Sequence, residues 1–276
     1  MTFLLAFILC FMLTDKVISL AEEYNTTMQM FEPFVWTFGD SSSILLISLL
    51  LVLLFSDIPF ITSGTPYYLM RTSRKAWIAG QVLYIIAATM LFLVFVLFST
   101  MILCAKNAFP GNIWSATAAT LGFSGDGAAV SLPVSVKTLE LSRPFSCMAS
   151  ILALMILYSL VMVLIMLVIN LRFGKLWGTV GVFVFTLFGF LLKPDTVAGI
   201  FKLPDELFYK ANVALGWISP LNHATYQMHN FGFDRLPRLW QSYAIFGVVI
   251  VVLIVLSVFS IKKYNFYFVG TDQGGF

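Results

Sequence analysis

The side chains best able to bind a metal ion or to carry redox chemistry are few. The chain has two histidines, His223 and His229, and three cysteines, Cys10, Cys104 and Cys147. No two cysteines have the CxxC spacing of a zinc site or a redox motif. Two imidazoles without a nearby cysteine or a convincing carboxylate partner make a poor metal site. We therefore expect no metal centre, and we expect both histidines to lie on a polar outer surface.

A serine motif suggests a second kind of chemistry. Residues 122–125 read Gly-Phe-Ser-Gly, which matches the GxSG motif of rhomboid proteases. In those membrane proteins a histidine in a later span must activate the serine. Here Asp126-Gly127 follows the motif, and neither histidine lies in an apolar segment. The motif therefore predicts a glycine-rich turn, and we expect no enzymatic activity of the chain itself.

The elements that position these residues follow from the composition. Of the 276 residues, 60% are hydrophobic and 11% are charged, with a mean hydropathy of +0.95. Soluble domains are about half apolar and about a quarter charged, so an ordinary soluble enzyme is excluded. Uncharged stretches of about 20 residues can cross a bilayer, and in lipid such segments must be helices. Long apolar stretches without Asp, Glu, Lys or Arg lie at 76–105, 144–171, 176–192 and 239–261.

The sequence thus predicts an all-α polytopic membrane protein with six transmembrane helices in a single transmembrane domain, residues 1–276. The spans are expected near 3–21, 44–61, 79–103, 147–171, 176–192 and 240–261. The first span is interrupted by Asp15 and Lys16 and could also be a signal peptide, because residues 19–21 resemble a cleavage site. The uncharged start of the chain favours a retained span.

The loops differ in their content of basic residues. Loops 62–78, 172–175 and 262–276 hold seven Lys and Arg in 36 residues, whereas the longer loops on the other side hold eight in 111. Because cytoplasmic loops are richer in Lys and Arg, we expect a plasma-membrane protein with both termini in the cytoplasm. The net charge of +3 is too small to indicate a nucleic-acid partner.

The cytoplasmic loops are too short for an enzymatic domain. The sequence also has no GxxxxGK[ST] phosphate-binding loop, so any ATP must be bound by another polypeptide. On the outer side, Cys104 and Cys147 flank the 104–146 loop, and a disulfide between them remains open if the third and fourth spans are neighbours.

Asp57 lies near the inner end of the second span, before Pro59. Acidic residues within a membrane are candidates for proton or ion transport. A lone acid near the interface can equally reach water or cap a neighbouring helix. Secondary transporters usually carry more charged residues at mid-membrane and an internal repeat, and this sequence shows neither.

The loop between the second and third spans predicts a short helix. Thr65 is a suitable N-cap, and Pro66 suits the first helical position. The helix would place Tyr67, Arg71 and Arg74 on one face. Such a segment is either an interfacial helix anchored by basic and aromatic residues or a docking helix that inserts into a partner protein.

Two stretches carry a resemblance to a known family. SDIPFITSGTPYYLMRTSRKAWIAGQVLY (56–84) resembles the region between the second and third spans of type-2 ABC transporter permeases. FYKANVALGWISPLNHATYQMHNFG (208–232) is similar to their re-entrant outer segment before the sixth span. The resemblance implies a cytoplasmic coupling helix that contacts the ATPase. Its candidate residues are Tyr67, Tyr68, Arg71, Arg74 and Lys75. Members of the family usually begin with a cytoplasmic amphipathic helix, whereas this chain enters the membrane almost at Met1.

The resemblance implies the membrane-spanning subunit of a bacterial ABC exporter. It would pair with a second permease subunit, identical or different, and with ATP-binding cassette subunits that bind the ATP, and it would need no cofactor of its own. Its uncharged spans suit an amphipathic or hydrophobic cargo, such as a peptide, a bacteriocin or a lipid-linked molecule. The alternatives are a receptor or immunity-type membrane protein that acts through its outer loops, and a secondary transporter.

Overall fold

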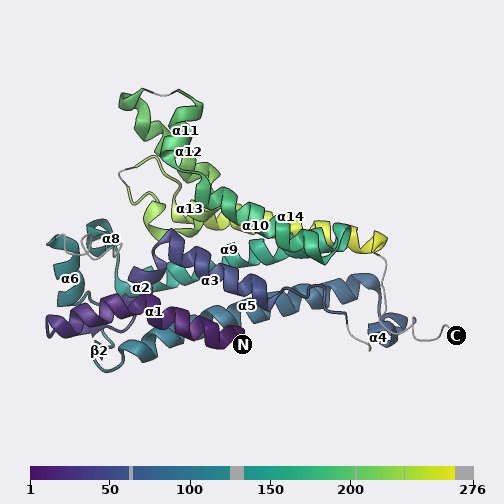
Figure 1. Ribbon diagram of the computed structural model, residues 1–276, viewed down its shortest axis with the longest axis horizontal. Helices are drawn as coiled ribbons and strands as arrows, with labels where there is room; N and C mark the ends of the chain where they lie inside the picture. Colours follow the sequence, from purple (N-terminus) through teal and green to yellow (C-terminus); the bar gives the residue numbers. More distant parts are fainter. Residues whose placement is uncertain (62–64, 125–133, 203, 233, 265–276) are drawn as a thin grey trace.

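The computed structural model describes residues 1–61, 65–124, 134–202, 204–232 and 234–264 (Figure 1). This part of the chain is mostly helical, as the sequence predicts. Its strands are β1 (Met28–Gln29) and β2 (Ala108–Phe109), which pair in parallel with Met28 opposite Ala108.

Four helices are long and apolar enough to cross a membrane: α1 (Thr2–Glu23), α5 (Arg74–Cys104), α9 (Pro144–Phe173) and α14 (Leu239–Ser260). Two more candidate spans are bent pairs. α2 (Glu32–Phe38) meets α3 (Ser41–Leu54) at 90°, and α10 (Lys175–Leu191) meets α11 (Pro194–Ile200) at 85°. The described residues therefore form four candidate spans, or six if each bent pair counts as one. The length and apolar composition of these helices make the protein a membrane protein.

The remaining elements are short. They are α4 (Thr65–Arg71), α6 (Ala116–Phe123), α8 (Val136–Leu141), η1 (Asp205–Leu207), α12 (Phe208–Ile218), α13 (Pro220–Ala224), η2 (Tyr226–Met228) and η3 (Ile261–Lys263). Pro144, Pro194 and Pro220 each begin a helix, where the missing N–H of proline leaves no bond unmade.

The helix of the second span ends earlier than the sequence predicts. Segment 44–61 is apolar almost throughout, but α3 ends at Leu54, and residues 55–61 are not helical. Pro59 explains part of the difference, because a proline disfavours helical backbone at the residue before it. At the other end Asp40 caps α3, its carboxylate accepting a hydrogen bond from Ser42 N at 3.0 Å.

Helix α9 forms the centre of the bundle. It packs against α10, α14, α5 and α3, and 72% of its most apolar stretch is buried, compared with 28% for α1 and 17% for α14. α9 and α10 form a tight hairpin about Gly174, whose φ of +97° lies in the region that favours glycine. The first and last helices thus lie at the rim, where their apolar faces are free to contact lipid.

The bundle has two different ends. The basic end is where Arg74, Arg172, Lys175 and Lys262 lie, at the termini of α5, α9, α10 and η3. The loop end carries α6, α8, α13 and residues 225–232 and 234–238. Figure 1 shows α4 beyond the basic end, apart from the long helices, and α6 and α8 together at the loop end. Phe3 in α1 packs on Phe92 and Phe95 in the second half of α5.

Candidate functional site

The predicted coupling helix is divided by Ser73. α4 ends at Arg71, and α5 begins at Arg74, where the Ser73 hydroxyl accepts a hydrogen bond from Ala76 N at 3.2 Å. A serine at this position favours a helix start over a continuous helix, because its side chain satisfies a free backbone N–H. The expectation that Tyr67, Arg71 and Arg74 share one helix face is therefore wrong.

Arg74 instead contacts the end of the last helix. Its Nη1 atom donates to the Lys262 carbonyl at 3.1 Å and lies 3.4 Å from the Tyr264 carbonyl and 3.5 Å from that of Ile261. The last carbonyls of a helix lack partners within the helix and attract cations. Arg74 thus holds the start of α5 against the end of α14.

Tyr67, Arg71, Arg74 and Lys75 of the predicted docking face are all exposed. Tyr67 is 68% exposed, and Arg71 and Lys75 also face solvent. Tyr67 and Arg71 are four residues apart in α4 and so lie on one side of it. Tyr68 belongs to α4, but its side chain is outside the described part of the structure.

Asp57 lies beyond the end of α3, and its side chain is 78% exposed. Its Oδ1 atom lies 3.6 Å from Nζ of Lys175, the first residue of α10. This position fits the interfacial alternative rather than an acid within a span. Exposed ion pairs of this kind contribute about 0–1 kcal/mol to stability.

A pocket of about 570 Å³ lies at the basic end, between the last turns of α9 and α14. Arg172 Nε donates to the Ser260 hydroxyl at 3.1 Å, and Lys262 Nζ lies 5.1 Å from the centre of the Phe259 ring. The pocket thus combines two cations with exposed aromatic walls. Its lining residues are Leu171, Arg172, Phe173, Phe259, Ser260 and Lys262.

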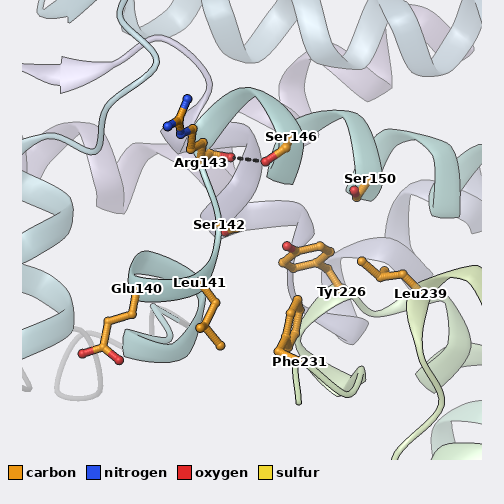
Figure 2. Close-up of a pocket in the computed structure, with 9 residues that line it drawn as sticks. All are labelled: Glu140, Leu141, Ser142, Arg143, Ser146, Ser150, Tyr226, Phe231 and Leu239. Carbon is orange, nitrogen blue, oxygen red and sulfur yellow. Dashed lines mark hydrogen bonds between the residues drawn. The ribbon is translucent and has the colours of Figure 1, made fainter. Parts of the chain in front are cut away.

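A second pocket, of about 480 Å³, lies at the loop end (Figure 2). Figure 2 shows the rings of Tyr226 and Phe231 on one side, and the Glu140 carboxylate and the Arg143 guanidinium pointing away from them. Ser146 donates to the Arg143 carbonyl at 2.9 Å. The lining residues are Glu140, Leu141, Ser142, Arg143, Ser146, Ser150, Tyr226, Phe231 and Leu239.

Distant segments hold this pocket together. Lys137 in α8 forms an ion pair with Asp234, and its Nζ lies 5.6 Å from the centre of the Phe231 ring. The Phe231 and Tyr226 rings have centroids 5.1 Å apart. α8 is thereby attached to Phe231 and Asp234, and the pocket lies between two segments that are far apart in the sequence.

The two histidines, on either side of Tyr226 in the sequence, are buried, so the prediction of a polar outer surface is wrong. His223 is 3% exposed, and both His229 and Ser242 are 0% exposed. The Ser242 hydroxyl oxygen lies 2.8 Å from His223 Nδ1 and 2.8 Å from His229 Nε2. The sequence conceals this contact, because Ser242 belongs to the apolar run that forms α14.

Burial affects how both imidazoles titrate. It lowers the pKa of His223 below the usual 6.5, against the opposing effect of the hydrogen bond to the Trp217 carbonyl. Burial also lowers the pKa of His229 to about 4, against the opposing effect of its bonds to the Tyr226 and Thr225 carbonyls. The two rings are therefore neutral at pH 7.

Sequence reasoning also missed Glu32, which is 1% exposed. Its carboxylate accepts hydrogen bonds from Ser115 N at 2.7 Å, Ser115 Oγ at 2.6 Å and Gln29 N at 3.1 Å. Ser115 also caps α6. A buried carboxylate needs such donors, and here they attach the start of α2 to the start of α6.

The remaining candidates for chemistry have structural roles. Ser124 follows α6, and its hydroxyl donates to the Thr120 carbonyl at 2.5 Å, while residues 125–127 lie outside the described residues. The three cysteines are buried free thiols, so Cys104 and Cys147 do not form a disulfide. Among the described residues no group of three His, Cys, Asp or Glu side chains could hold a metal ion.

Comparison of the chain with protein-family models, with curated proteins and with solved structures gives no match.

Proposed function

We propose that the protein is the membrane-spanning permease subunit of an ATP-driven exporter of the ABC type. It works in the plasma membrane with a separate ATP-binding cassette subunit and a second permease subunit. Its cargo is an amphipathic or hydrophobic molecule, such as a peptide or a lipid-linked compound. The protein catalyses no covalent chemistry, and both of its termini face the cytoplasm.

The observation that carries this proposal is α4. It joins α3 to α5, lies beyond the basic end of the bundle and exposes Tyr67 and Arg71 on one side (Figure 1). A helix of seven residues is not stable in isolation, so α4 gains from packing against another surface. Tyrosine and arginine are also among the residues that contribute most to protein interfaces. These features suit a helix that docks into a partner subunit.

The segment before α14 supports the same proposal. α12 and α13 fold back at the loop end, where α13 packs against α9, α10 and α3. Ser219 caps the start of α13, and its hydroxyl donates to the Gly189 carbonyl of α10 at 3.2 Å. A short helix attached to the ends of the spanning helices matches the re-entrant outer segment that the family resemblance implies.

The experiment reverses one charge at each end of the bundle. Arg71→Glu alters α4 without touching the Arg74 contacts, and Lys210→Glu makes the same change on exposed α12 as a control. Purified from its native membrane, the unmodified protein should bring with it a vanadate-sensitive ATPase activity. Arg71→Glu should lose most of this activity while inserting normally, and Lys210→Glu should keep it. Equal activity in both variants would contradict the proposal.

A receptor-type function is the second candidate, because the pocket in Figure 2 lies at the loop end and is open to solvent. A receptor of this kind needs no ATPase partner. Absence of ATPase activity from the unmodified protein would favour this function over the exporter.

A further inference from the structure

The buried group His223–Ser242–His229 fixes where the ring protons lie. A backbone carbonyl only accepts hydrogen bonds, and the Trp217 carbonyl lies 3.1 Å from His223 Nε2, so this nitrogen carries the hydrogen. The Thr225 and Tyr226 carbonyls lie 3.0 and 3.1 Å from His229 Nδ1, which carries the hydrogen of that ring. The two neutral rings are therefore opposite tautomers.

Both rings then present a bare nitrogen to the same hydroxyl. His223 Nδ1 and His229 Nε2 each lie 2.8 Å from Ser242 Oγ. A hydroxyl has one hydrogen and donates it to one acceptor. One of the two ring nitrogens is consequently left without a donor among buried side chains, and this costs free energy.

One proton added to a ring supplies the missing hydrogen-bond donor. A protonated ring donates to Ser242 Oγ, and Oγ donates its own hydrogen to the neutral ring, so each polar atom gains a partner. A second proton, on the other ring, would remove one of these hydrogen bonds again, because the Ser242 hydroxyl hydrogen would lose its acceptor. It would also place two positive rings on either side of one oxygen atom. The geometry therefore accommodates one proton and not two.

We propose that His223, Ser242 and His229 form a binding site for a single proton. The proton is taken up as the pH falls. The hydrogen bonds that it completes join the segment of α13 and η2 to α14. This proposal does not rest on the exporter function. The proton goes first to His223, because its hydrogen bond to Trp217 is only partly buried, whereas both bonds of His229 to carbonyls are fully buried.

Some groups around the site favour a protonated ring, and others oppose it. The three carbonyls and the C-terminal end of α13 favour a positive ring, whereas the first turn of α14 and the burial of both rings oppose it. α3 has no titratable side chain, and α10 has only Lys175 at the basic end. Within the described structure neither ring hydrogen-bonds to a carboxylate. Titratable or charged side chains on the other packed elements are Arg143, Cys147, Tyr158 and Arg172 (α9), Tyr209 and Lys210 (α12), Tyr226 (η2), and Arg238 and Tyr243 at the start of α14.

Nitrogen-15 NMR of the imidazoles tests the proposal, because His223 and His229 are the only histidines of the chain. With the full-length protein in lipid nanodiscs at pH 7.5, we expect one ring protonated on Nε2 and the other on Nδ1. On acidification one ring should become an imidazolium below pH 6.5. The second should titrate more than about one pH unit lower, as expected for coupled sites.

Two variants test the role of the hydroxyl. His223→Gln should abolish the first proton uptake and leave His229 neutral with its hydrogen on Nδ1. Ser242→Ala should lower the first apparent pKa by about one unit or more, because the imidazolium loses its acceptor. Identical tautomers, titration of both rings together, or no uptake before the protein unfolds would each overturn the proposal.

Discussion

Arg74 donates a hydrogen bond to the backbone carbonyl of Lys262 at 3.1 Å, across a sequence separation of 188 residues. The contact holds the first residue of α5 to the end of the last spanning helix. Arg71, three residues earlier, is exposed like Arg74, but the Arg74 guanidinium is bonded to the backbone at the end of the bundle. Two arginines in one short loop thus have different roles, and their variants should behave differently.

The first prediction concerns this contact. Arg74→Ala should lower the free energy of unfolding by about 1 kcal/mol, at the low end for charged hydrogen bonds because the site is exposed. Lys75→Ala removes the neighbouring exposed cation and should change stability by less than about 0.5 kcal/mol. Thermal unfolding in one detergent compares the two variants, and equal stability would show that the Arg74 contact is weak.

The second prediction concerns the hairpin of α9 and α10. A Cβ atom on Gly178 would lie 1.8 Å from Asn170 Oδ1, and Asn170 is held in place by its bond to the Ile58 carbonyl at 2.6 Å. Gly178→Ala should therefore destabilise the protein by about 1–3 kcal/mol. In α5, a Cβ atom on Gly80 meets nothing within 4 Å. Gly80→Ala should be neutral or stabilising by up to about 1 kcal/mol, and a loss of stability there would contradict this reasoning.

The third prediction concerns the two sides of the membrane. Lys75 and Lys262 lie at the basic end, whereas Lys137 and Lys210 lie towards the loop end. Single cysteines at these positions, in a background without Cys10, Cys104 and Cys147, should react with a membrane-impermeant thiol reagent added outside intact cells only at 137 and 210. Labelling at 75 or 262 and not at 137 or 210 would reverse the orientation that the loop charges indicate.

Much of the fold could be predicted from the sequence, because long uncharged runs leave few alternatives. Runs 76–105, 144–171 and 239–261 correspond to α5, α9 and α14 within a few residues, since length and apolarity alone decide such helices. α3 was predicted too long because the apolar pattern continues through a stretch that is not helical. Pro59 is a local signal for a helix end, but the hydropathy of the whole segment favours a helix and outweighs this signal in a prediction from the sequence.

The sites were predicted less well, because they depend on tertiary contacts. Ser73 divides the predicted coupling helix, and the acceptors of Arg74 lie near the other end of the chain. His223 and His229 look like surface residues in a polar stretch, and their partner Ser242 lies 19 and 13 residues further on. Ser242, in the first turn of a mostly apolar helix, is a local feature that could have drawn attention to this site.

The last prediction concerns the pH dependence of stability. Because burial lowers the pKa of His229 from 6.5 to about 4, His229 binds a proton in this interval in the unfolded chain, whereas in the native protein His229 stays neutral. Stability then rises with pH across the interval, by about 1.4 kcal/mol per pH unit. The contribution is complete above pH 6.5 and is lost as the pH falls towards 4. Thermal unfolding at pH 7.5 and 5 should show the loss, and His229→Gln should show less of it. A variant with the same pH dependence as the unmodified protein would assign the loss to other groups.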